Sequence, residues 1–123
     1  MVRIAFLFPI LLTTFFSNAQ NEVTVQHACS FNHEITNKTF LVLAPSRQAE
    51  EIVNNILSVT DLPISLDLIA SDCKEVLATK IGNQRVILYN PDFIKEFYIS
   101  SERKWSVYVA MAHAIGHHVK GTI

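Results

Sequence analysis

The sequence predicts one α+β domain in which a small sheet packs against helices, and three patterns support this fold class. Apolar residues recur at helical spacing through residues 49–57. Strand-like runs occupy residues 64–68 and 84–89. Helix-start signals lie at Ser46 and at Asn90-Pro91. Short strands that alternate with helices in a chain of 123 residues favour a single domain with one modest core.

The first half of the chain is expected to hold a strand and a helix. Residues 20–38 are polar and are expected to be irregular, whereas residues 39–44 are β-rich and apolar and are expected to form a buried strand. Ser46 is the expected N-cap of the helix that follows. Asp61-Leu62-Pro63 should end this helix. The face that it buries is expected to consist of Ala49, Ile52, Val53, Ile56 and Leu57.

The second half is expected to hold two or three strands and two helices. Ile64, Leu66 and Leu68 alternate with polar residues, as in a half-buried strand. Residues 76–81 fit a strand or a short helix, and Gly82-Asn83 favours a hairpin turn into residues 84–89. Asn90 and Pro91 should begin a short helix. Ser100 or Ser101 should begin the last helix, which is expected to end at Gly121.

The N-terminus has the pattern of a secretory signal peptide. Met1-Val2-Arg3 is a short positive start, residues 4–16 are almost uninterrupted in apolar character, and Ser17-Asn18-Ala19 offers a cleavage point. The apolar run is shorter than the roughly 20 residues of a membrane-spanning helix, although an uncleaved anchor remains the alternative. Residues 1–19 are therefore expected to be removed. The domain 20–123 is expected to be secreted or periplasmic, with no membrane span.

The net charge limits which partners the chain can bind, and the cysteine count bears on whether it forms a disulfide. The formal net charge of −1 provides no basic surface for a nucleic acid, so no nucleic-acid partner is expected. Cys29 and Cys73 would both remain after cleavage, and an oxidising compartment favours a disulfide between them. Two buried thiols and cysteine ligation of zinc are the alternatives.

The last helix carries two histidines at the spacing of a metal-ligand pair. Four residues advance about 400° along an α-helix, so His113 and His117 lie on the same side and can bind one Zn²⁺. A solvated pair is the alternative. His118 lies about 100° away and is expected in a supporting or surface role. Both histidines, with Ala114 just beyond them, lie at the edge of an apolar stripe formed by Trp105, Tyr108, Val109, Ala112, Gly116 and Val119.

The segment Ala112–Gly121 resembles the A-H-E-I-G-H-H-x-x-G segment of gluzincin-type (HExxH) zinc metallopeptidases of bacterial envelopes. Residues 85–93 are similar to the strand and helix start that precede the metal helix in secreted members. The resemblance implies the N-terminal half of a zincin-like domain, with the HxxxH helix at its C-terminal end. It departs from the family at Ala114, which replaces the catalytic glutamate, and at Thr122. The chain also ends before the family's third ligand, so the resemblance implies an incomplete domain.

Two classes of function follow from these residues. The resemblance implies an exported zinc-metallopeptidase-like protein whose peptide partner adds as a strand to the sheet edge. Hydrolysis is expected to be impaired or absent, because Ala114 cannot act as a general base and the zinc site, built on His113 and His117, is weak or incomplete. A non-catalytic secreted binding or structural module is the alternative. Candidates for a third ligand within the chain are aspartates and His27, His33, Glu34 and His118.

Overall fold

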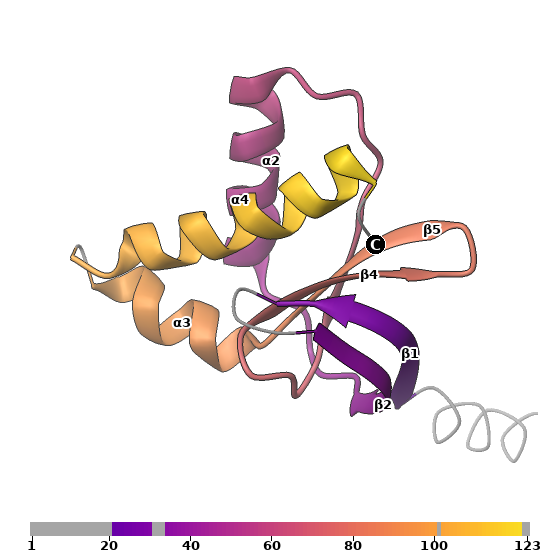
Figure 1. The fold of residues 1–123 in the computed structure, drawn as a ribbon. Coiled ribbons are helices and arrows are strands. Elements are labelled where there is room, and N and C mark those ends of the chain that lie inside the picture. Colours follow the sequence, from indigo (N-terminus) through magenta and orange to yellow (C-terminus); the bar gives the residue numbers. More distant parts are fainter. Residues whose placement is uncertain (1–20, 31–33, 101, 122–123) are drawn as a thin grey trace, which may run out of the picture.

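The structure, a computed structural model, describes residues 21–30, 34–100 and 102–121. Within these ranges a five-stranded mixed sheet packs against three helices, which confirms the predicted α+β class (Figure 1). The predicted signal peptide, residues 1–19, and the predicted first mature residue, Gln20, lie outside the described residues. The elements are β1 (Glu22–Cys29), β2 (Glu34–Leu41), α2 (Arg47–Thr60), β3 (Asp67–Ala70), β4 (Val76–Ile81), β5 (Gln84–Tyr89), α3 (Pro91–Ile99) and α4 (Lys104–Lys120).

The strands are arranged in the order β2-β1-β4-β5-β3. β3 and β5 are parallel, and every other neighbouring pair is antiparallel. The predicted turn at Gly82-Asn83 joins β4 to β5, and Gly82 there adopts a φ of 63°, a left-handed conformation that glycine accepts without strain. The ambiguous residues 76–81 are therefore a strand.

The prediction that residues 20–38 are irregular is wrong, because they contain β1 and the first half of β2. The two strands form an antiparallel hairpin in which Glu22 lies opposite Leu41 and Cys29 opposite Glu34. The sequence of this hairpin lacks the apolar alternation that predicts a strand, because most side chains of β2 are polar and face solvent. Backbone hydrogen bonds join β2 to β1, and β1 in turn pairs with β4, which holds the hairpin in the sheet.

The larger core lies between the sheet and the helix layer. α4 contacts β4 and β5, and α2 and α3 pack against α4 and each other (Figure 1). The predicted face of α2 is confirmed, with Ile52 and Val53 buried and Ile56 partly buried. The buried members of this core are Ala49, Ile52, Val53, Ala70, Val76, Ala78, Ile87, Tyr89, Ile94, Val107, Met111, Ala114 and Ile115.

The predicted apolar stripe of α4 is wrong in its direction. Trp105 is 71% exposed, Val109 51% and Val119 48%. The buried side of the helix is turned by roughly 120° from that stripe at 3.6 residues per turn. It consists of Val107, Met111, Ala114, Ile115 and His118.

A smaller apolar cluster on the opposite face of the sheet joins residues of β1, β2, β4 and β5. Leu77 of β4 and Leu88 of β5 point to this second face, because side chains alternate along a strand and their neighbours Ala78 and Ile87 belong to the helix side. Phe40 of β2 packs with them in a smaller cluster. The hairpin thus contributes to a second core, and its end at Cys29, where β1 connects to β2, lies beside α4.

Local sequence signals set the helix ends. The Ser46 hydroxyl accepts a hydrogen bond from the Ala49 amide, and the Asn90 side chain accepts one from the Asp92 amide, so both predicted N-caps are confirmed. α4 begins at Lys104, later than Ser100 or Ser101 predicts, and ends at Gly121 as expected. None of the helices in the described ranges combines the length and the apolar character that crossing a bilayer requires.

Candidate functional site

The helical spacing of His113 and His117 brings their imidazoles together on α4. The two Nε2 atoms are 3.1 Å apart, and the rings meet edge to face with centroids 4.7 Å apart. Two nitrogen ligands of one tetrahedral zinc, each about 2.0–2.1 Å from the ion, lie about 3.3 Å apart. The two rings are within hydrogen-bond distance of each other, and their nitrogen atoms are close to the separation of two ligands that share a zinc ion.

The surroundings of His117 favour a neutral imidazole, the form that binds metals. Burial is the main cause that lowers the pKa of His117, and His113 and Lys120 add to it, whereas the Glu34 carboxylate raises this pKa. Glu34 lies opposite Cys29 at the end of the hairpin where β1 connects to β2, and Cys29 and His113 line the same cavity. This end of the hairpin thus lies beside α4.

Ala114 lies on the buried side of α4 and is 2% exposed. This position contradicts the expectation that it lies off the apolar face, although it does follow the histidines around the helix as predicted. Its methyl group also borders a cavity that His113 lines. The position between the two histidines therefore borders a cavity, and its methyl group cannot move a proton.

His118 has a structural role. It is 2% exposed, and its Nε2 lies 2.9 Å from the carbonyl oxygen of Val86 on β5. Burial is the main cause that lowers its pKa. The neutral ring therefore donates to Val86 and joins α4 to the sheet, so the surface role considered for it is wrong and it is not a third metal ligand.

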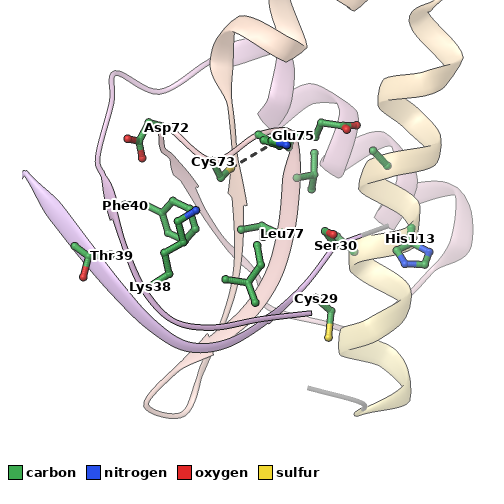
Figure 2. Close-up of a pocket in the computed structure, with 15 residues that line it drawn as sticks. Cys29, Ser30, Lys38, Thr39, Phe40, Asp72, Cys73, Glu75, Leu77 and His113 are labelled. Atoms are coloured by element: carbon green, nitrogen blue, oxygen red, sulfur yellow. Dashed lines mark hydrogen bonds between the residues drawn. The ribbon is translucent and has the colours of Figure 1, made fainter. Parts of the chain in front are cut away.

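A cavity of about 340 Å³ lies between the hairpin, the β3–β4 connection and α4 (Figure 2). Phe40 and Leu77 supply apolar walls, and Lys38, Asp72 and Glu75 add charges. Charges of both signs beside apolar walls suit a ligand with both polar and apolar parts.

Cys29 and Cys73 line this cavity as free, buried thiols, so the predicted disulfide is not present in the structure. Figure 2 shows the reason, since the two side chains lie toward different ends of the cavity with Leu77 between them. The Cys73 thiol donates to the carbonyl oxygen of Glu75 at 3.7 Å. Burial raises the pKa of Cys73 to about 11, which makes this thiol a poor nucleophile at neutral pH.

The hairpin carries a second group of metal-ligand residues. Among the described residues, His27, Cys29 and Glu34 bring one ligand atom each to within 4.8 Å of the others, and this group could hold a metal ion. The His27 Nε2 lies 3.4 Å from a Glu34 carboxylate oxygen. Burial first, and then the Glu34 charge, raise the pKa of the Cys29 thiol.

The sequence analysis singled out all three residues but assigned them to different sites. His27 and Glu34 were candidates for the third ligand at the helix pair, and Cys29 was assigned to a disulfide. His27 was placed in an irregular region, but it lies in β1. A histidine and a cysteine two positions apart in a strand share one face, which is the signal that recognition of β1 would have provided. His33 lies outside the described residues.

Comparison of the chain with protein-family models, with curated proteins and with solved structures found no match in any of the three.

Proposed function

We propose that this chain is an exported zinc-binding protein of the gluzincin metallopeptidase type that does not hydrolyse peptides by itself. The observation that carries the proposal is the 3.1 Å separation of the His113 and His117 Nε2 atoms on one side of α4. Support for export comes from the N-terminal pattern of residues 1–19, which predicts a mature chain that begins at Gln20.

His113 and His117 would hold the ion through Nε2. Bound zinc lowers the pKa of a coordinated water and polarises a carbonyl oxygen. Peptide hydrolysis also needs a base to take a proton from that water and deliver it to the leaving amine. Ala114 supplies none, and a positioned base contributes typically about 10²–10⁴-fold in rate. Weak zinc binding without peptide cleavage is therefore the expected behaviour.

A second candidate, a non-catalytic binding module, is favoured by the cavity beside His113. Its mixed lining and the edge position of β2 suit an extended peptide, which would add as a strand and place a side chain in the cavity. In this case the partner is a peptide or protein ligand rather than a substrate. Neither candidate cuts a peptide. They differ in whether the ligand is a zinc ion at His113 and His117 or a peptide at the cavity beside His113.

Zinc titration by calorimetry tests the imidazole pair. The measurement uses the secreted chain with Cys29→Ser, because the hairpin group could bind an ion of its own. We expect weak binding that falls by about tenfold or more when His113→Ala is added. Adding Lys120→Ala instead is the matched control. It should leave zinc affinity unchanged or improved, since Lys120 places a positive charge near His117.

Unchanged zinc affinity after His113→Ala would show that the helix pair is not the site and would refute the proposal. An unstructured peptide incubated with the zinc-loaded chain should remain intact. Chelator-sensitive cleavage that His113→Ala abolishes would instead show that the chain is an active peptidase.

The intact mass of the secreted chain shows where its N-terminus lies. A mass that still includes residues 1–19 would refute signal-peptide cleavage.

A further inference from the structure

The β1–β2 hairpin places a thiol, an imidazole and a carboxylate next to one another. Cys29 and Glu34 are direct cross-strand partners, which brings their side chains to the same face. His27 precedes Cys29 by two positions on β1, and side chains two apart in a strand point to the same side. The ligand atoms of all three residues lie within 4.8 Å of one another.

The separations fit a zinc ion after small side-chain movements. In tetrahedral zinc sites, nitrogen and oxygen ligands lie about 2.0–2.2 Å from the ion and sulfur about 2.3 Å, so two ligand atoms are about 3.3–3.6 Å apart. The His27 Nε2 and the Glu34 carboxylate oxygen are already 3.4 Å apart. The Cys29 sulfur lies within 4.8 Å of both atoms, so the remaining distances would be closed by movement of the more exposed His27 and Glu34 side chains.

One of the three ligand residues is buried and the other two are accessible to solvent, so an ion can reach a ligand that is already in place. Cys29 is 6% exposed, so its sulfur is held in a fixed position by the surrounding core. The side chains of His27 and Glu34 are 38% and 73% exposed, which leaves a route for an ion from solvent. One mixed set of sulfur, nitrogen and oxygen ligands suits Zn²⁺ better than Mg²⁺ or Ca²⁺, which prefer oxygen alone.

We propose that His27, Cys29 and Glu34 form a zinc site of their own, in which a thiolate, an imidazole and a carboxylate bind one ion and water completes the tetrahedron. Binding releases the Cys29 thiol proton to solvent, and a Zn–S bond takes its place. The site does not depend on His113 or His117. It goes beyond the proposed function, because it uses different residues and needs no resemblance to a peptidase.

Cobalt substitution tests the site, because thiolate bound to Co²⁺ gives a near-ultraviolet charge-transfer band that imidazole ligands alone do not give. We expect the full chain to show this band on Co²⁺ titration and zinc to displace it. Cys29→Ser should abolish the band. Cys73→Ser is the matched control, because it removes the other buried thiol at the same cavity, and it should keep the band.

The remaining variants separate this site from the helix pair. His113→Ala combined with His117→Ala should leave the thiolate band and its cobalt affinity unchanged. Glu34→Gln should weaken cobalt binding by about tenfold or more, as expected when a metal ligand is lost. Circular dichroism shows that each variant is folded.

Three results would overturn the proposal. One is cobalt binding to the full chain without a thiolate band. Another is a band that survives Cys29→Ser. The third is a band that disappears in folded His113→Ala/His117→Ala, since that would show a single ion shared between hairpin and helix. Failure of the helix-pair titration leaves the hairpin result untouched, so the two proposals fail separately.

Discussion

At the scale of single residues, Ala114 matters both for the chemistry of the histidine pair and for the packing of the core. By its place between His113 and His117 it stands where the proposed resemblance to zinc peptidases would put a general base. By its contacts it is a core residue, 2% exposed and packed against the sheet side of α4. The first meaning is a prediction from the resemblance. The sequence could not show the second, because the buried direction of the helix depends on where the sheet lies.

Ala114→Glu is therefore expected to destabilise the fold. A carboxylate in place of the buried methyl group would lose its hydration, and we expect a cost of about 2 kcal/mol or more in the free energy of unfolding. Ala112→Glu is the matched control, since Ala112 is exposed on the same helix and its change should stay within about 0.5 kcal/mol. Urea denaturation compares the two, and equal midpoints would show that the cavity hydrates the new carboxylate.

At the scale of elements, the ends of the helices could be predicted and the buried side of α4 could not. Ser46, Asn90 and Gly121 act through the backbone next to them, so local sequence is sufficient. α4 instead has apolar residues around most of its circumference, and periodicity then offers two faces of similar quality. The hairpin was missed for a related reason, since its stability comes from pairing rather than from an apolar pattern.

Replacing one large side chain on each face of α4 with alanine should show which face is buried. Met111 is fully buried, and we expect Met111→Ala to lower the free energy of unfolding by about 2–4 kcal/mol, as for other large buried side chains. Val109 is 51% exposed, and Val109→Ala should change it by no more than about 0.5 kcal/mol. Chemical denaturation monitored by circular dichroism measures both, and a larger loss for Val109→Ala would contradict the orientation of α4.

At the scale of the whole molecule, the number and kind of layers follow from the sequence, but the strand order does not. The turn at Gly82-Asn83 is local and predicts its hairpin. The insertion of β1 between β2 and β4, and the parallel pairing of β3 with β5, join segments far apart in the chain. The candidate site depends on these distant pairings, because β1 must lie beside β4 before Cys29 and Glu34 can approach α4.

His118 makes the stability of this layered arrangement depend on pH. Burial lowers its pKa in the folded state, whereas an unfolded chain has a histidine pKa near about 6.5. As the pH falls below about 6.5, the unfolded state takes up a proton that the folded state does not. The free energy of unfolding should therefore be highest above that pH. It should decline below it by at most about 1.4 kcal/mol per pH unit for this one group.

Denaturation between about pH 7.5 and 5.5, with a chelator present so that metal binding does not contribute, measures this decline. His118→Gln keeps an N–H that can donate to the Val86 carbonyl but cannot be protonated, so its unfolding free energy should depend less on pH than that of the parent chain. His27→Gln is the matched control, because that side chain is 38% exposed on the hairpin, and it should keep the parent slope. An unchanged slope in His118→Gln would show that this contact between α4 and β5 does not couple protonation to folding. The coupling belongs to the whole molecule, because a proton on His118 places a charge in the buried region where the helix layer meets the sheet.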